Sequence, residues 1–407
     1  MTNPTPTPQR RKPSRAFARH GRISVQSKAS AAWGLFFKVV GLVAGAAVAL
    51  STIAVVELSN TIKANGIVLA GSTKITEADL NGPINMLLVG SDTREGQGEG
   101  FGDDTSVLAD VIILLHVSAD RKNATALSFP RDLLVPWPKC PSTSIPPGPG
   151  YLPQSLGQIN ATIANGGPGC TLLTVEALTG LKIPYLGLID FKGVIEMSNA
   201  IGGVEVCVTQ PIDDPYTFLK LDAGTHTLQG KDALKFLRTR HGVGDGSDLS
   251  RISNQQVFLT SLLRKVKSAG VLGNPIYLYS LATAAARNMQ FSESLTDVNV
   301  MVAMAGALRN VDLDKMTFLQ VPSRGGLPAP YSGRVAPIYE KANLIFEKLQ
   351  KDEPIILAAA NGGQGAVVVD ETGAVASPSP SASASPNPSA LPEGILGTTA
   401  DTKTCSN

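Results

Sequence analysis

Two aspartates in this sequence stand at the ends of apolar runs. Asp92 follows Met86–Val89, and Asp110 directly precedes Val111–Val117. Ligand-binding groups in open α/β sheets collect where strands end, so these carboxylates are placed to share a ligand. Two carboxylates, completed by water and a substrate phosphate, form a typical Mg²⁺ site. We therefore predict Asp92 and Asp110 as metal ligands, with an Asx turn and a strand cap as the structural alternatives.

Arginines also follow or precede strongly apolar segments. Guanidinium groups bind phosphate oxygens through paired hydrogen bonds, so several converging arginines beside a carboxylate-held metal predict a diphosphate site. Phosphoryl transfer needs mainly positioning and neutralisation of charge, which such a site supplies. The predicted catalytic residues are Arg131, Arg238, Arg240 and Arg251.

A further polar block contains Asp248, Arg251 and Gln255, at positions i, i+3 and i+7. This spacing places the three side chains on one face of a helix, although Asp248 also suits the cap of that helix. The residues predicted to bind substrate are Arg94, Asp248 and Gln255. The sequence contains no GxxxxGK[ST], GxSxG or HExxH motif, which argues against a P-loop enzyme and other common hydrolases. It identifies no general base.

Short apolar runs that alternate with helical patterns must position these residues. The mixture predicts an α/β fold, with a mixed central sheet flanked by helices on both faces and preceded by one transmembrane helix. Strands are expected over residues 84–89, 111–117, 124–129, 204–209 and 316–321, and helices over 170–178, 231–238, 251–269, 295–308 and 335–349.

The charge of the 407-residue chain is divided unevenly, although the formal net charge is only +2. Residues 1–38 contain eight Lys or Arg and no acidic residue, which leaves 27 basic against 33 acidic residues, or −6, for the remainder. An uncharged run, Val39–Val56, follows this basic segment. Its length suits a membrane span, and the positive-inside rule places the N-terminus in the cytoplasm and the remainder outside the cell membrane. A cleaved signal peptide is the alternative.

Four cysteines lie on the predicted outer side, where an oxidising compartment permits disulfides. Their spacing matches no zinc or CxxC pattern. Three pairings are possible, and we favour Cys140 with Cys170 because both lie in Pro- and Gly-rich loops. The other two cysteines are Cys207 and Cys405.

Composition predicts five successive segments. Residues 377–392 form a Ser/Pro/Ala tract that buries too little apolar surface to fold. The predicted segments are a basic cytoplasmic tail (1–33), a transmembrane helix (34–57), a stalk (58–83), an extracytoplasmic catalytic domain (84–352) and a disordered tail (353–407).

Six short sequence blocks, named below in chain order, together resemble the LytR-CpsA-Psr family in its actinobacterial type. The resemblance extends over about residues 84–270, more weakly to about 350, and includes the single anchor. It implies an extracytoplasmic enzyme that transfers a phosphoglycan from a polyprenyl diphosphate carrier to a cell-wall acceptor, usually peptidoglycan. The blocks are Leu87–Arg94, Ala109–Asp110, Ser128–Asp132, Gln158–Asn160, Leu228–Arg240 and Asp248–Gln256.

The resemblance assigns Mg²⁺ to Asp92 and Asp110 and the diphosphate to the four catalytic arginines and Gln255. Three positions depart from the family pattern, because Leu108, Gln158 and Asn254 replace Arg, Lys and Arg. The lost positive charges suggest weaker diphosphate binding or a different glycan. Such variation is compatible with an arabinogalactan-like polymer or with a surface protein as the acceptor.

A polyprenyl chain also requires an apolar groove. The stretches Val257–Val266 and Val298–Leu308 are candidates to line it, with an ordinary core role as the alternative. Two other functions compete with the transferase: a polyprenyl diphosphate hydrolase, and a noncatalytic, membrane-tethered module that binds or regulates the wall. The excess of positive charge is confined to the N-terminal segment, and the remainder carries −6, so no nucleic-acid partner is expected.

Overall fold

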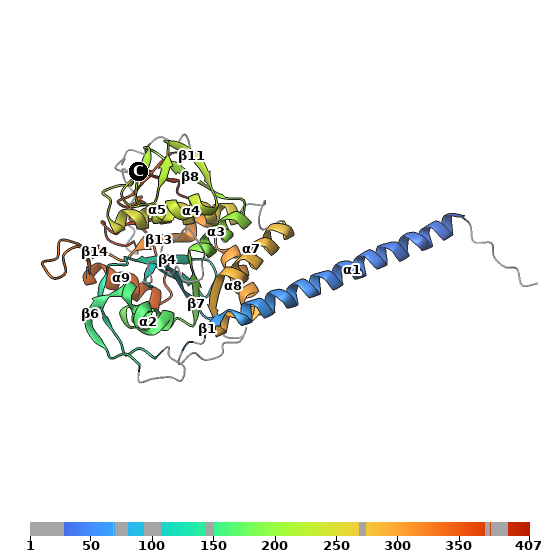
Figure 1. Ribbon diagram of the computed structural model, residues 1–407, viewed down its shortest axis with the longest axis horizontal. Coiled ribbons are helices and arrows are strands. Elements are labelled where there is room, and N and C mark those ends of the chain that lie inside the picture. Colours follow the sequence, from blue (N-terminus) through green and yellow to red (C-terminus); the bar gives the residue numbers. More distant parts are fainter. Residues whose placement is uncertain are drawn as a thin grey trace, which may run out of the picture. The chain divides into compact units, whose positions relative to one another are not determined.

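The computed structural model describes residues 28–67, 69, 80–92, 107–142, 150–267, 274–370, 375 and 390–407. The chain divides into two compact units, residues 1–55 and residues 56–407 (Figure 1). Helix α1 (Lys28–Ala64) contains the predicted membrane segment 34–57. Its residues 35–64 are long and apolar enough to cross a membrane, with a mean hydropathy of 2.4 over an 18-residue window.

The end of α1 belongs to the second unit. Ile62 is buried in a cluster that also contains Phe291 and Leu295. Strand β1 (Gly66–Ile67) then pairs in parallel with β12 (Met289–Ser292) at the edge of the main sheet. The prediction of a separate stalk over 58–83 is therefore wrong at its N-terminal end, because apolar residues there pack on the domain. Residues 68 and 70–79 lie outside the described part of the chain.

The main sheet has eight strands in the order β1-β12-β7-β2-β3-β4-β13-β17. Strand β2 pairs in parallel with β7 and antiparallel with β3, and β4 pairs in parallel with β13, so the sheet is mixed as predicted. The bounds are β7 Tyr185–Ile189, β2 Ile84–Ser91, β3 Ala109–Val117, β4 Ala124–Phe129, β13 Met316–Gln320 and β17 Gly397–Thr399.

Helices cover both faces of this sheet (Figure 1). Alternation along β2 explains why, since Leu87 and Val89 enter one core cluster while Met86 packs against the other. Helices α2 (Thr162–Thr179) and α9 (Tyr339–Gln350) contribute to the first cluster, and α8 (Val298–Asn310) contributes to the second. The α/β fold class is confirmed. The predicted helix 335–349 begins only at Tyr339, because residues 336–337 form the short strand β15.

A second sheet, in the order β11-β8-β18-β16, packs with α4 and α5 around a third apolar cluster. The bounds are β8 Val204–Val208, β11 Gly224–Leu228, β16 Ala366–Val368, β18 Thr404–Ser406, α4 Gly230–Arg238 and α5 Asp248–Lys267. The remaining elements are α3 Phe191–Ala200, α7 Pro275–Asn288, the 3-10 turns Ile159–Ala161, Glu293–Leu295 and Leu313–Lys315, and the hairpins β5–β6 (Leu134–Trp137, Gln154–Gln158), β9–β10 (Ile212–Asp214, Leu219–Leu221) and β14–β15 (Ser323–Arg324, Ala336–Pro337).

Both ends of the predicted disordered tail 353–407 are folded, so that prediction is wrong at its described ends. Strand β17 pairs with β13 in the main sheet, and β18 joins β16 to β8 in the second. The weakly patterned residues gain their stability from strands that lie far away in the sequence, which local composition does not reveal. Residues 376–389, within the Ser/Pro/Ala tract, are outside the described chain.

All four cysteines form disulfides. Cys140 pairs with Cys170, which confirms the favoured pairing, and Cys207 pairs with Cys405 over a sequence separation of 198 residues. The second bond joins β8 to β18 and therefore fastens the C-terminal strand to the second sheet.

Candidate functional site: an arginine and carboxylate cluster beside an apolar pocket

Asp92 and Asp110 lie at the same end of the β2–β3 pair. Gly90 pairs with Val111 and Ser91 with Ala109, so Asp110 is the extra residue of a β-bulge. A bulge redirects the side chain of its unpaired residue. Asp92 closes the strand pair, because its Oδ1 accepts a hydrogen bond of 2.7 Å from the Leu108 amide. This contact spans 16 positions in the sequence and is therefore a cross-strand contact rather than an Asx turn, and it uses only the backbone of Leu108.

The Asp110 carboxylate contacts two of the predicted arginines. Arg131 Nη1 donates to Asp110 Oδ1 at 2.5 Å, and Arg251 Nη1 lies 3.6 Å from the same oxygen. Burial alone would raise the pKa of Asp110, but Arg251, Arg131 and Arg238 reverse this effect and lower it. Asp110, on β3, is therefore an anionic group that holds together Arg131 of the turn after β4 and Arg251 of α5.

Asp248, the first residue of α5, is the second carboxylate in the cluster. Arg251 Nη2 lies 2.7 Å from Asp248 Oδ1, and the Arg131 backbone amide donates to Asp248 Oδ2 at 3.2 Å. Arg251 Nη2 also donates to the Asp110 carbonyl oxygen at 2.8 Å. Asp248 thus orients the arginines, and this position supports a role in shaping the site rather than direct contact with substrate.

The Nε groups of Arg131 and Arg251 are buried and donate no hydrogen bond to any residue that the structure describes. Each guanidinium therefore retains a donor inside the cluster. Burial would lower the pKa of Arg131, but Asp110, Asp248 and Asp132 reverse the shift and raise it. Permanently charged groups with unused donors are suited to bind phosphate oxygens.

Arg238 and Gln255 reach the cluster from α4 and α5. The Arg238 guanidinium lies over the ring of Phe191, 4.4 Å from its centroid. Gln255 Nε2 donates to the Leu237 carbonyl oxygen at 3.0 Å and so connects α5 to the end of α4. The guanidinium therefore packs on an aromatic face, and its charge also helps to lower the pKa of Asp110.

Arg240 faces the same cluster from the loop after α4. Its pKa is lowered by burial first and then by repulsion from Arg131 and Arg251, against the opposing effect of Asp248 and Asp132. Arg240 therefore lies close enough to these four residues for their charges to act on it. Repulsion among the arginines also means that an anionic ligand would relieve unfavourable charge.

Asp132 is a member of the cluster that we did not predict as a site residue. Its Oδ1 accepts hydrogen bonds from Gln158 Nε2 at 2.8 Å and Arg334 Nη1 at 3.2 Å, while Oδ2 lies 3.6 Å from Arg131 Nε. Position 158, where the family pattern has Lys, therefore contacts this carboxylate as a neutral amide. Arg334 lies about 200 positions away in the sequence, and no local pattern reveals its role.

Asn254, the other departure at a basic position of the family pattern, is fully buried. Its Nδ2 donates to the Phe236 carbonyl oxygen at 2.7 Å, which connects α5 to α4. Asn254 therefore has a structural role.

Arg94, Asp103 and Asp104 lie outside the described residues, so the prediction that Arg94 binds substrate stays a prediction.

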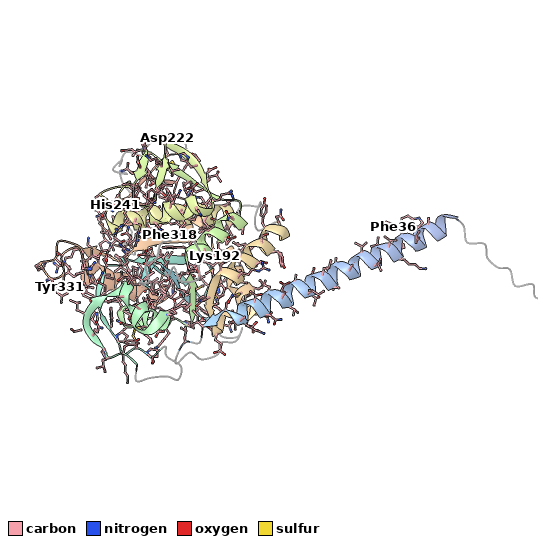
Figure 2. All side chains as sticks on the ribbon, in the orientation of Figure 1. Phe36, Lys192, Asp222, His241, Phe318 and Tyr331 are labelled. Carbon is pink, nitrogen blue, oxygen red and sulfur yellow. A yellow bond between two sulfur atoms is a disulfide. The ribbon has the colours of Figure 1, made fainter. Side chains whose placement is uncertain are left out.

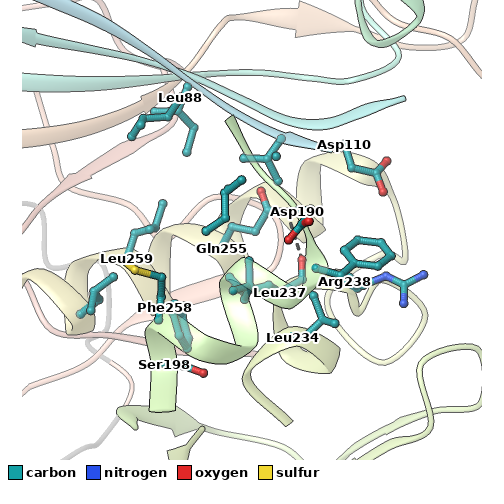
Figure 3. A pocket seen from close by; sticks show the side chains of 18 of the residues that line it. Leu88, Asp110, Asp190, Ser198, Leu234, Leu237, Arg238, Gln255, Phe258 and Leu259 are labelled. Carbon is teal, nitrogen blue, oxygen red and sulfur yellow. Dashed lines mark hydrogen bonds between the residues drawn. The ribbon is translucent and has the colours of Figure 1, made fainter. Parts of the chain in front are cut away.

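An apolar pocket of about 250 Å³ opens beside the cluster. Figure 3 shows Asp110 and Arg238 at one end and Leu88, Phe258 and Leu259 at the other. The walls come from β2 and β3 on one side and from α3, α4 and α5 on the other, including Met197, Ile201, Leu234, Leu237 and Leu262. Within the predicted stretch 257–266, Phe258, Leu259 and Leu262 line the pocket, whereas no residue of 298–308 does, since α8 packs in the core.

The donors at this site suit Mg²⁺, although no group of three or more His, Cys, Asp or Glu that could hold a metal occurs among the described residues. Mg²⁺ is commonly held by one or two carboxylates together with substrate phosphates. Asp92 and Asp110 supply two carboxylates from adjacent strand ends, and the low pKa of Asp110 keeps it anionic. The pair fits a metal that the substrate completes.

Comparisons with known proteins show which proteins this chain is similar to. The sequence profile of the LytR_cpsA_psr family matches residues 52–350. Cell wall biosynthesis protein LcpA of Corynebacterium glutamicum is 29% identical over 265 residues, which make up 60% of this chain and 50% of LcpA. The polyisoprenyl-teichoic acid–peptidoglycan teichoic acid transferase TagT of Bacillus subtilis is 29% identical over 240 residues, 58% of this chain and 67% of TagT. The chain thus spans about half the length of LcpA.

A solved structure has the same fold. The LytR-Csp2A-Psr enzyme from Actinomyces oris matches with a TM-score of 0.51 at 24% sequence identity, covering 70% of this chain and 94% of that chain. The likeness supports the α/β architecture with its large mixed sheet.

Proposed function

The chain belongs to the LytR-CpsA-Psr family, and we propose that it transfers a phosphoglycan from a polyprenyl diphosphate carrier to peptidoglycan. One observation carries this proposal: an apolar pocket opens directly onto a cluster of arginines and carboxylates. A prenyl diphosphate has the matching two-part chemistry, with a hydrocarbon chain and an adjacent polyanion. The similarity to TagT, a polyisoprenyl-teichoic acid–peptidoglycan teichoic acid transferase, supports the same substrate class.

In the proposed complex the arginines bind the diphosphate oxygens. Arg131 and Arg251 hold buried Nε donors for this purpose, and Arg238 lines the mouth of the pocket. Mg²⁺ held by Asp92 and Asp110 would neutralise charge that develops on the phosphates. Asp248 and Asp132 keep the guanidinium groups in place before substrate arrives. Preorganised cations stabilise a transition state without having to reorganise.

The proposed reaction is a displacement at the phosphorus attached to the sugar. An acceptor hydroxyl forms a new phosphorus–oxygen bond and loses its proton, while the bond to the bridging oxygen of the diphosphate breaks. Polyprenyl phosphate leaves and keeps the second phosphate. The glycan therefore reaches the acceptor together with one phosphate.

We also propose that α1 anchors the domain with its N-terminus in the cytoplasm. The basic residues before the apolar helix support this orientation. The two disulfides support an oxidising location for residues 56–407. An anchored enzyme stays near the bilayer that contains the lipid carrier, which raises the frequency of encounter.

The proposal is tested with Arg240→Ala and Asp110→Ala variants of the full chain in detergent, given a lipid-diphosphate glycan, Mg²⁺ and peptidoglycan. Removal of one preorganised charge from such a site should reduce turnover by about a hundredfold or more. Arg309→Ala, on the exposed side of α8, is the matched control and should retain activity. Undiminished transfer in both site variants would show that the cluster is not the active site.

Two further measurements separate the proposal from its rivals. A hydrolase would release glycan phosphate at the same rate with and without peptidoglycan, whereas the proposed transferase should depend on the acceptor. A noncatalytic wall-binding module would retain polymer binding after both substitutions and would form no covalent product. A protein acceptor in place of peptidoglycan would be revealed by glycan attached to protein rather than to wall fragments.

A further inference from the structure

An exposed aromatic surface adjoins the arginine cluster on the β9–β10 hairpin. The Tyr216 side chain is 73% exposed, and its ring lies 4.3 Å from the ring of His241, centroid to centroid. His241 directly follows Arg240 in the chain and lies at the edge of the domain in Figure 2. The two ring planes are tilted by 35°. Large aromatic side chains are usually well buried, so an exposed pair of rings in contact beside a ligand site requires an explanation.

One buried carboxylate fixes this surface relative to Arg240. Asp214, 1% exposed, accepts hydrogen bonds at Oδ2 from the backbone amides of Arg240 (3.0 Å) and His241 (3.2 Å). Its Oδ1 accepts from the amide of Tyr216 at 2.9 Å and from the amide of Thr217 at 3.4 Å. The loop that carries Tyr216 and the loop that carries Arg240 are thus bound to the same side chain.

A second contact joins the same two loops. Thr217 Oγ1 and Thr239 Oγ1 lie 2.9 Å apart, within hydrogen-bond distance. Phe218 follows, 79% exposed and with a φ of 55°, a left-handed conformation that bulky residues rarely adopt. The hairpin therefore holds aromatic side chains in solvent on a rigid connection to Arg240, at a cost in backbone conformation.

We propose that the Tyr216–His241 ring pair binds the sugar that is attached directly to the carrier diphosphate. The inference rests on the proposed function, in which Arg240 binds a phosphate oxygen. Because Asp214 binds the amides of Arg240, His241 and Tyr216, the ring pair is held beside Arg240 and so beside the group bonded to that phosphate, which in the donor substrate is a sugar ring. The C–H bonds of one pyranose face carry partial positive charge, and the negative face of an aromatic ring attracts them.

This surface makes Tyr216 and His241 specificity-determining residues for the donor. The arginines and the apolar pocket bind the lipid diphosphate equally well with and without a glycan. The ring pair would therefore distinguish the glycan-bearing lipid from the bare lipid diphosphate. Asp214 is a positioning residue, because it touches no substrate and sets the distance between the ring pair and Arg240.

The experiment measures binding of two probes to the full chain in detergent: geranylgeranyl diphosphate, and the same lipid diphosphate carrying one glucose or N-acetylglucosamine unit. Tyr216→Ala should weaken binding of the sugar-bearing probe by about three- to tenfold, the size of one lost aromatic contact. Binding of the bare diphosphate should not change. Tyr216→Phe keeps the ring and should bind both probes as the wild type does.

The control is Tyr339→Ala at the start of α9, another partly exposed tyrosine, which should bind both probes normally. His241→Ala should reproduce the selective loss seen for Tyr216→Ala. Equal weakening of both probes, or of neither, would overturn the proposal. A raised KM for peptidoglycan with unchanged donor binding would also overturn it, because the occupant would then be the acceptor. Failure of the wild type to bind either probe would instead refute the proposed function.

Discussion

Removal of Arg251 should reveal how strongly the cluster is held before substrate binds. The Arg251 residue is 3% exposed and contacts Asp248 at 2.7 Å and the Asp110 carbonyl oxygen at 2.8 Å. Arg251→Met keeps most of the aliphatic volume and removes these contacts. Asp248, whose side chain is 9% exposed, would then keep Arg131 as its one remaining ion-pair partner among the residues that the structure describes. Breaking one partner of a buried ion pair costs about 3–5 kcal/mol, and the remaining Arg131 contact predicts a value near the lower limit.

Urea unfolding of the full chain in detergent, followed by tryptophan fluorescence, measures this cost. Most of the loss should come from the carboxylate left without its partner, so the double variant Arg251→Met/Asp248→Asn should be more stable than the sum of the two single effects predicts. We expect a coupling energy of about 1–3 kcal/mol. The matched control is Lys235→Met, which breaks another i,i+3 ion pair, with Asp232 at 3.0 Å, on the exposed surface of α4. That change should cost no more than about 1 kcal/mol.

Additive effects of the two cluster substitutions would refute the reasoning. So would equal losses for Arg251→Met and Lys235→Met, because burial is the property that distinguishes the two pairs. Either result would mean that the arginines are not held in place by Asp248 in the absence of ligand.

Three other predictions follow from the pocket, the disulfide and Asp214. Leu259→Trp should fill part of the 250 Å³ pocket and weaken geranylgeranyl diphosphate binding at least about tenfold, or ~1.4 kcal/mol, with no loss of inorganic diphosphate binding; the exposed substitution Leu344→Trp is the control. Cys405→Ser should lower the free energy of unfolding by about 2–5 kcal/mol, and an unchanged urea midpoint would contradict it. Burial alone would raise the pKa of Asp214, but hydrogen bonds from four backbone amides reverse this effect and lower the pKa below 3.8. The wild type should therefore be more stable than Asp214→Asn near neutral pH and should lose this advantage as the pH falls through the lowered pKa of Asp214. An advantage that persists unchanged at pH 3 would show that charge is not its source.

The strands around the site were predictable because burial on both faces requires long apolar runs. Strand β4 has the predicted limits, and β2 and β3 extend the predicted runs by two residues each. Asp92, Asp110 and Arg131 stand at the ends of these runs, and they were predicted as site residues because strand ends gather ligands in α/β sheets. Arg238, Arg240 and Arg251 were identified by their charge beside apolar segments in an acidic domain.

The rest of the site depends on contacts between distant segments. Arg334 reaches Asp132 from a loop that precedes α9, and Asp214 binds the Arg240 loop from a separate hairpin. Neither residue has a local pattern that distinguishes it from a solvated charge. The C-terminal strands β17 and β18 are short and polar in part, so only their partners in the two sheets stabilise them.

The most direct test of the central claim follows the two phosphorus atoms of the donor. A polyprenyl diphosphate glycan labelled in both phosphates is incubated with the full chain, Mg²⁺ and peptidoglycan, and the label is then measured in the wall fraction and in the lipid fraction. We predict that one of the two labelled phosphates becomes bound to peptidoglycan with the glycan, that the other remains in polyprenyl phosphate, and that Arg240→Ala abolishes both changes. Glycan bound to the wall without phosphate, or release of glycan phosphate into solution at the same rate without peptidoglycan, would contradict the account.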